Sequence, residues 1–294
     1  MKGVILAAGY ATRFLPASKT IPKEMFPLID RPAIDFIVQE MVDSGINDIL
    51  LVSSRRKKVM EDYFDREIEL SSAFSKSNEI EKLAVIKPIE ANIFTLRQQR
   101  MMGTGNALML VEPFVDNQPF VVAYPDDIVL GEKPLSRQLI ETWEKTGDTV
   151  LAVKELEEDQ LFRYGVIDPA DSGKIMQVNK MVEKPLPGTA PSRFVSYGRY
   201  LYTPDLFEAL RRSDKNHSHL SEFTQTEAIN HLAAQGQVSA LQFEGTRYDL
   251  GEPLGFLTSA LQIGLLRPEY KAALLDEMRR LLKLHDNPDN ENSG

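Results

Sequence analysis

The chain has 294 residues, of which 43% are apolar, so it can bury a sizeable core. Its 43 acidic residues outnumber its 34 basic residues and give a net charge of −9, which disfavours nucleic acid as a partner. The absence of cysteine excludes disulfides, thiolate metal sites and cysteine nucleophiles, and no apolar run approaches the roughly 20 residues of a membrane span.

The first fifty residues predict a strand, a long loop, a helix and a second strand. Val4–Ala8 is a continuous apolar run that ends at Gly9, as is typical of a buried parallel strand. It is too short for the core of a signal peptide, so we expect a cytoplasmic protein. A helix begins at Pro32, carries apolar side chains three and four residues apart, and ends before Gly45. Asp48–Val52 is the second strand.

The rest of the chain predicts further alternation of strands and helices. The charged, weakly periodic segment 66–92 indicates surface helices and loops. The elements expected after it are a strand 93–98, a turn 103–105, a helix 106–111, a central strand 120–124, a helix 135–145, a strand 150–154, strands 165–167 and 195–202, helices 204–212 and 222–234, a strand 238–243, and helices 253–265 and 268–284.

The order of these elements favours one α/β domain with helices on both faces of a mostly parallel sheet. No Gly/Ser-rich linker divides the chain, so we assign residues 1–265 to the domain, 266–285 to a C-terminal helical appendage and 286–294 to a polar, disordered tail. The appendage places Leu274, Leu275, Met278, Leu281 and Leu282 on one stripe. Packing of the stripe onto its own domain is favoured over a dimer seam.

The loop after the first strand is the first candidate site. It places Arg13, Lys19 and Lys23 in an acidic protein, close behind Gly9, whose lack of a side chain lets backbone N–H groups approach a phosphate. An ordinary solvated loop is the alternative, but the clustering favours an anion site. The loop is not a dinucleotide fingerprint, because two of its three glycines are missing, and no P-loop motif exists in the chain.

Acidic residues at strand ends are the second kind of candidate. Asp126, with Asp127 beside it, follows the central strand at the sheet edge that also carries the Gly9 loop, where open α/β sheets bind ligands. Mg²⁺ uses one or two carboxylates together with substrate phosphates, so the pairing favours a metal site over a helix cap or turn. Asp249, followed by Gly251, is a weaker example of the same pattern.

The segment Glu183-Lys184-Pro185 is a further candidate. Adjacent residues of a strand point to opposite faces, but a turn forced by Pro185 lets Glu183 and Lys184 reach one pocket. Exposed Glu–Lys pairs are common, so the pattern alone leaves a solvated surface pair open.

Taken in order, these places resemble the bacterial UTP–glucose-1-phosphate uridylyltransferases, from Met1 to about residue 265. The resemblance is carried by Ala8-Gly9, Thr12-Arg13-Phe14-Leu15-Pro16-Ala17, Lys19, Ile21-Pro22-Lys23-Glu24-Met25, Phe64-Asp65, Arg97-Gln98, Gly103 with Gly105 and Ala107, Pro125-Asp126, Tyr164-Gly165-Val166, Val182-Glu183-Lys184-Pro185, Gly198-Arg199-Tyr200, and Asp249 with Gly251.

The resemblance implies a Rossmann-like αβα nucleotidyltransferase fold and a Mg²⁺-dependent reaction. UTP and glucose 1-phosphate would give UDP-glucose and pyrophosphate, and the enzyme would form a homo-oligomer. It implies that Arg13 and Lys23 neutralise the triphosphate, that Ala8, Gly9, Gln98 and Gly103 hold the uracil, and that Asp126 and Asp249 bind Mg²⁺. Gly165 and Glu183 would hold the sugar hydroxyls and Lys184 the sugar phosphate, and Gly198 would be a further substrate-binding residue.

Several residues depart from the family's pattern. Ala11 replaces a usual Gly, which puts a positive φ there in doubt. Met102 replaces a usual Lys, Asn106 replaces a usual His, and Leu250 replaces a usual Cys. Thr224 lies in a run that also differs from the family's pattern. Two alternatives to this function remain. The enzyme could use another base, such as that of dTTP, or another sugar 1-phosphate, or the chain could be a non-catalytic regulator that binds a sugar nucleotide.

Overall fold

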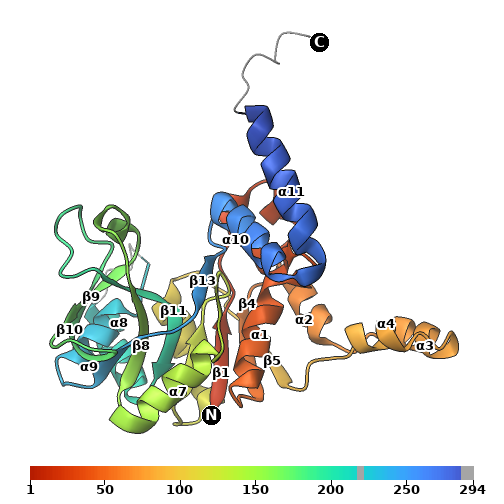
Figure 1. The fold of residues 1–294 in the computed structure, drawn as a ribbon. Helices are drawn as coiled ribbons and strands as arrows, with labels where there is room; N and C mark the ends of the chain where they lie inside the picture. The colour runs from red at the N-terminus through yellow and green to blue at the C-terminus, as the bar shows by residue number, and fades with distance from the viewer. Residues whose placement is uncertain (217–221, 286–294) are drawn as a thin grey trace.

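The computed structural model describes residues 1–216 and 222–285, and the expected disordered tail 286–294 lies outside that part of the chain. A nine-stranded sheet crosses the molecule in the order β5-β4-β1-β6-β11-β8-β12-β10-β9 (Figure 1). Its strands are β1 (Lys2–Leu6), β4 (Asp48–Ser53), β5 (Asn92–Arg97), β6 (Phe120–Ala123), β8 (Thr149–Glu155), β9 (Gly165–Pro169), β10 (Ile175–Glu183), β11 (Phe194–Tyr202) and β12 (Val238–Gln242).

The strands that end at the predicted ligand-binding edge of the sheet run parallel to one another. β5, β4, β1 and β6 pair in parallel, so their carboxyl ends meet at one edge. β11 and β10 run against the other strands. The predicted α/β class is therefore confirmed. The sheet is mixed, because β10 and β11 pair antiparallel with their neighbours while the other strands share one direction. The long apolar runs that predicted the strands are buried from both sides.

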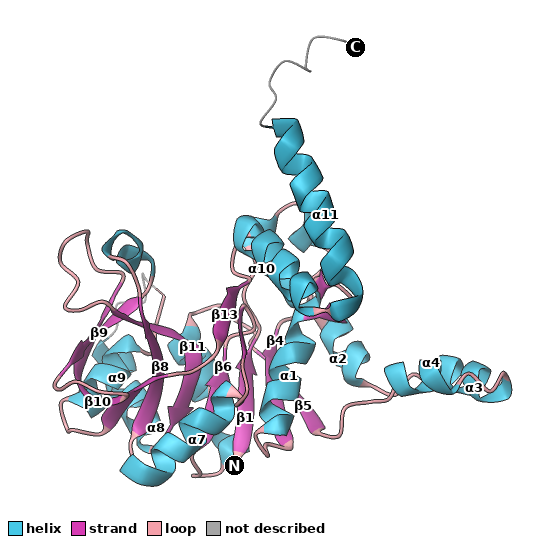
Figure 2. Cartoon of the chain, viewed as in Figure 1, coloured by secondary structure: helices cyan, strands magenta, loops and turns pink. Residues whose placement is uncertain are grey.

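Helices cover both faces of the sheet (Figure 2). The helices are α1 (Ala33–Asp43), α2 (Lys58–Phe64), α3 (Ile68–Lys76), α4 (Ile80–Val85), α5 (Thr104–Met109), α6 (Glu112–Val115), α7 (Leu135–Thr146), α8 (Asp205–Asn216), α9 (Thr226–Ala233), α10 (Pro253–Leu266) and α11 (Pro268–His285). One core cluster joins α1, α7 and α10 to the sheet, and the other joins α5, α8 and α9. Val121 and Val122 of β6 fall in different clusters, as the alternation of a strand requires.

Two predicted helices begin elsewhere than the sequence indicated. The helix expected at 106–111 begins at Thr104, with Gly103 before its first turn at φ +102°. The helix expected at 222–234 begins at Thr226. In both cases the residues before the apolar repeat make long-range backbone hydrogen bonds. The apolar periodicity of the sequence carries no information about such contacts, so it does not predict where these helices begin.

Within the segment 66–92, residues 68–85 form an arm that projects from the body, whereas Ile89 and Ala91 pack against the core (Figure 1). The arm contains α3 and α4, which contact each other and bury no residue. A glutamate side chain, Glu67, accepts from the backbone N–H groups of Glu69 and Leu70 at the start of α3. The predicted surface helices are thus present, although they extend away from the domain.

The C-terminal appendage contacts the body through its first half. α11 packs against α10, and Leu274 closely approaches Gly264. Further along the helix, Leu281 is 44% exposed and Leu282 is 62% exposed. In the apolar stripe predicted from the sequence, Leu274 therefore packs against the chain's own α10, whereas Leu281 and Leu282 are exposed to solvent.

Two short ribbons complete the fold, and the sequence reading did not predict their pairings. β2 (Pro27–Leu28) pairs with β3 (Arg31–Pro32), and β7 (Asp127–Leu130) pairs with β13 (Thr246–Asp249) in antiparallel orientation. In the second ribbon Asp249 lies opposite Asp127. This pairing carries the end of the chain's last strand to the residues that follow β6.

Candidate active site

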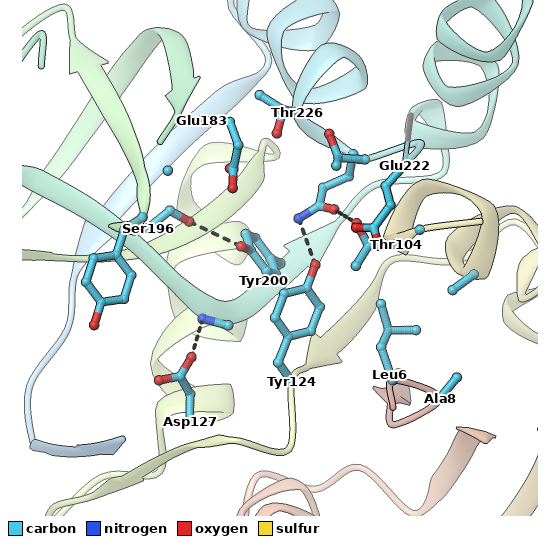
Figure 3. Close-up of a pocket in the computed structure, with 18 of the residues that line it drawn as sticks. Leu6, Ala8, Thr104, Tyr124, Asp127, Glu183, Ser196, Tyr200, Glu222 and Thr226 are labelled. Carbon is cyan, nitrogen blue, oxygen red and sulfur yellow. Dashed lines mark hydrogen bonds between the residues drawn. The ribbon is translucent and has the colours of Figure 1, made fainter. Parts of the chain in front are cut away.

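A cavity of about 460 Å³ opens along the carboxyl ends of the central strands (Figure 3). All seven predicted substrate-binding residues, and the predicted catalytic Lys184, line it: Ala8, Gly9, Gln98, Gly103, Gly165, Glu183, Gly198 and Lys184. In Figure 3, Ala8 and Leu6 lie at one side of the cavity, while Glu183 and Ser196 lie at the other. The cavity thus joins two walls that are far apart in the sequence.

The loop after β1 folds into three short 3₁₀ turns. Ala11 adopts the left-handed conformation at φ +53°, so the positive φ that its side chain put in doubt is present. Its carbonyl accepts a hydrogen bond from Ser18 Oγ at 2.8 Å. Phe14 anchors the loop by edge-on contacts with Phe26 and Phe256. The loop therefore has a defined shape despite its exposed cations.

Lys23 and Asp126 form an ion pair at the end of β6. Lys23 Nζ lies 2.6 Å from Asp126 Oδ2. Burial would raise the pKa of the Asp126 carboxyl, but the charge and the hydrogen bond of Lys23 outweigh it and hold that pKa below its usual range. Next to Lys23, Glu24 is buried in a second ion pair with Lys57, at 2.7 Å. That buried pair fixes the backbone from which Lys23 extends.

Arg247 joins the two acidic segments of the site. It lies 2.5 Å from Asp127 Oδ1 and 3.2 Å from Asp249 Oδ2, and its guanidinium stacks on Tyr197 at 4.1 Å. Burial, together with the nearby carboxylates Asp126 and Asp249, raises the pKa of Asp127 above its usual value despite the charge of Arg247. Arg247 thereby holds two acidic side chains that like-charge repulsion would separate.

Glycine 251 leaves a space between the predicted metal ligands. A Cβ there would stand 3.0 Å from Asp249 Oδ1, 3.6 Å from Asp126 Oδ2 and 3.8 Å from Arg13 Nη1. The structure therefore brings Asp126, Asp249 and Arg13 together. Within the described ranges no group of three or more His, Asp or Glu side chains is placed to hold a metal by itself. Two carboxylates near each other suit Mg²⁺, which binds one or two carboxylates together with substrate phosphates and seldom occupies an all-protein cage.

One side of the cavity is closed by contact between two loops. The backbone N–H of Gly105 donates to Phe223 O at 2.9 Å, and that of Phe223 donates to Met102 O at 2.9 Å. A Cβ at Gly103 would stand only 2.2 Å from Phe223 O, so no other residue fits there without movement. Gln225 bridges the loops, because it bonds Thr104 and donates to Tyr124 Oη at 2.7 Å (Figure 3).

The opposite wall is formed by β9, β10 and β11. Lys184 follows β10 at φ +46°, and its backbone N–H donates to Tyr164 O at 3.0 Å. The turn that presents Glu183 and Lys184 to one cavity thus begins at Lys184 itself, ahead of Pro185. Gly198 N donates to Asp127 Oδ2 at 3.2 Å, which ties this wall to the acidic residues after β6.

The sequence reading missed Arg247, Tyr124 and Gln225 as parts of the site. Arg247 and Asp249 are two residues apart in a strand and so lie on one face, a spacing that could have drawn attention to Arg247. Tyr124 and Gln225 carry no such signal, because their contact joins segments about one hundred residues apart. Among the departures from the family pattern, Leu250 is buried in the core and Met102 is exposed.

The nucleotidyl transferase family matches residues 2–264 of the chain. A "UTP--glucose-1-phosphate uridylyltransferase 2" of Staphylococcus saprophyticus is 41% identical over 95% of this chain and 97% of its own. The structure described as UTP-bound UGPase from Acinetobacter baumannii is 31% identical, with a TM-score of 0.85, over 96% of this chain and 98% of that one. A UDP-glucose pyrophosphorylase complexed with UDP-glucose is 33% identical, with a TM-score of 0.78, over 90% and 99% of the two chains.

These comparisons confirm the resemblance drawn from the short motifs. In the described part of the chain, no helix combines the length and the apolar content that crossing a membrane requires.

Proposed function

Because the chain belongs to the nucleotidyl transferase family, we propose that it transfers the uridylyl group of UTP to α-D-glucose 1-phosphate, forming UDP-glucose and pyrophosphate. The observation that carries this proposal is the placement of a charged cluster next to the cavity. Arg13, Lys23, Asp126 and Asp249 are not among its lining residues, but they lie next to Asp127, which lines the cavity together with Glu183 and Lys184. Relatives named for this reaction match the chain over nearly its full length.

The reaction is an in-line displacement at phosphorus. A phosphate oxygen of glucose 1-phosphate attacks the α-phosphorus of UTP, the bond to the bridging oxygen of the β-phosphate breaks, and pyrophosphate leaves with the bonding electron pair. The chain forms no covalent intermediate, so its residues act by positioning and by charge neutralisation. Arg13 and Lys23 neutralise the triphosphate, and Lys184 neutralises the sugar phosphate.

The remaining wall residues select the two substrates. The backbone at Ala8, Gly9 and Gly103, together with the Gln98 side chain, holds the uracil. Gly165 and Glu183 hold the sugar hydroxyls, and Gly198 borders them. Glycine suits position 165 because a Cβ there would stand 3.1 Å from both Glu183 Oε2 and Met181 Sδ, so a side chain would displace Glu183.

Mg²⁺ is the metal that the donor set fits best, with Asp126 and Asp249 as its ligands from the chain. When bound, it would neutralise charge on the triphosphate as the pyrophosphate leaves. The chain's own contribution is to hold the two carboxylates in place, through the ion pair of Lys23 with Asp126 and that of Arg247 with Asp249.

The test is to identify the product formed with Mg²⁺ from each pairing of UTP, dTTP or CTP with glucose, galactose or N-acetylglucosamine 1-phosphate, while pyrophosphate release is followed. We expect UDP-glucose to form fastest. A faster reaction with dTTP or with another sugar phosphate would change the assigned substrate. Nucleotide binding without pyrophosphate release would indicate a regulator.

We also expect a homo-oligomer in the cytoplasm. An apolar groove of about 520 Å³ lies between α10 and α11 and is lined by Leu257, Leu261, Tyr270 and Leu274, among others. Such a groove suits the exposed leucines of a second copy's α11. Sedimentation equilibrium of the parent and of Leu282→Glu tests this: the variant should dissociate, and a monomeric parent would refute the expectation.

A further inference from the structure

The side-chain amide of Gln98 has a fixed orientation in the cavity wall. Gln98 is only 6% exposed, and its Nε2 lies 3.2 Å from Gly103 O and 3.1 Å from Asn106 Oδ1. A backbone carbonyl can only accept a hydrogen bond, so the group that faces Gly103 must be the NH₂ of the amide. The orientation of Gln98 therefore does not depend on how the Asn106 amide is assigned.

Asn106 uses the second hydrogen of that NH₂. Because Nε2 has two hydrogens and two acceptors within reach, both donors of Gln98 are occupied, and Oε1 is the polar atom left for a ligand. Asn106 lies in the first turn of α5 and does not line the cavity, whereas Gln98 does. Asn106 therefore acts through Gln98 and not by contact with the base.

We infer that Asn106 is a positioning residue that makes the site select a base with an N3–H group. This rests on the proposed role of Gln98 in holding the uracil. Uracil donates from N3, which suits the accepting Oε1, whereas N3 of cytosine is itself an acceptor and would face Oε1 unpaired. Thymine shares the N3–H of uracil, so this contact separates UTP from CTP and leaves UTP and dTTP to be distinguished elsewhere.

The test compares the ratio of kcat/KM for UTP to that for CTP in matched variants. Asn106→Leu keeps the approximate size but removes the acceptor, so a buried N–H of Gln98 loses its partner and the amide can turn. We expect the ratio to fall about tenfold. Asn106→Asp restores an acceptor, in a helix N-terminal turn that tolerates negative charge, and should keep the parent ratio. Asn92→Leu, at the opposite end of β5, is the control.

The Gln98→Ala variant and the double variant with Asn106→Leu distinguish the role of Asn106 from the proposed role of Gln98. If Gln98→Ala leaves the ratio unchanged, Gln98 does not read the base and the proposed role fails. If Gln98→Ala lowers the ratio but Asn106→Leu does not, only the role of Asn106 is overturned. Asn106→Leu should add nothing when Gln98 is already Ala, and a further fall in that double variant would also overturn it.

Discussion

Lys184 is the residue whose role follows most directly from its local backbone. Its φ of +46° lies in the left-handed region, which costs a non-glycine residue about 1–2 kcal/mol. Its side chain is 64% exposed and lines the cavity, 3.9 Å from Glu183. A non-glycine residue with a left-handed backbone beside a cavity is typical of a functional position.

We predict that Lys184→Ala raises the KM for glucose 1-phosphate much more than the KM for UTP. A charge-assisted contact contributes roughly 1.5–3 kcal/mol, so the rise should be about one to two powers of ten. Arg13 and Lys23 would still neutralise the triphosphate. Steady-state kinetics with each substrate varied in turn check this, with the exposed Lys180→Ala as control. A selective rise in the KM for UTP would move Lys184 to the triphosphate.

The sequence predicts residues at strand ends far better than residues brought together by long-range pairing. Asp126 could be predicted because an apolar strand precedes it directly. Arg247 was missed, because the only signal for it was its spacing from Asp249, while its partner Asp127 lies 120 residues away and meets it through the β7–β13 ribbon. Gln225 was missed for the same reason.

At the scale of elements, the contact between the loop before α5 and the loop before α9 closes the cavity. Both helices begin where this contact places them, not where their apolar repeats begin. The helical periodicity of both segments could be predicted from the sequence. The start of each helix could not, because it depends on the other loop.

We expect Gly103→Ala to raise the KM for UTP and to lower the unfolding midpoint. The added methyl group would meet Phe223 O and separate the two loops. Gly147→Ala is the control for a left-handed φ without a clash, because Gly147 has φ +75° and nothing within 4 Å of its Cβ position. It measures a strain of about 1–2 kcal/mol, whereas Gly103, at φ 102° and ψ 177°, adds the strain of a region that glycine alone occupies readily to the contact with Phe223. Equal effects of the two substitutions on stability and on KM would disprove the loop contact's role.

At the scale of the molecule, helices cover both faces of the sheet, and tyrosine hydroxyls are buried between the helices and the strands. Tyr200 and Tyr202 of β11 stack on each other, and burial raises the pKa of Tyr200 to about 12 and that of Tyr202 well above its usual value. Among the described residues, the Tyr202 hydroxyl has no hydrogen-bond partner. These groups stay protonated in the folded chain at pH values where the unfolded chain ionises them.

Stability should therefore fall above about pH 10, the pKa of an unperturbed tyrosine. There the unfolded state binds fewer protons than the folded state, so the free energy of unfolding decreases as pH rises towards the folded pKa. Urea unfolding at pH 8 and pH 10.5 measures this. Tyr202→Phe should be at least as stable as the parent at pH 8 and should lose less on raising the pH. An equal loss in both proteins would contradict the account.

The whole account depends on the charged cluster at the end of β6 being the reaction centre. Turnover of Asp126→Asn at saturating Mg²⁺, UTP and glucose 1-phosphate tests this most directly, with unfolding curves to verify the fold and the exposed Asp159→Asn as control. Loss of a metal ligand should lower kcat about 10²–10³-fold while the unfolding midpoint stays near that of the parent. Near-normal turnover of the folded variant would contradict the central claim.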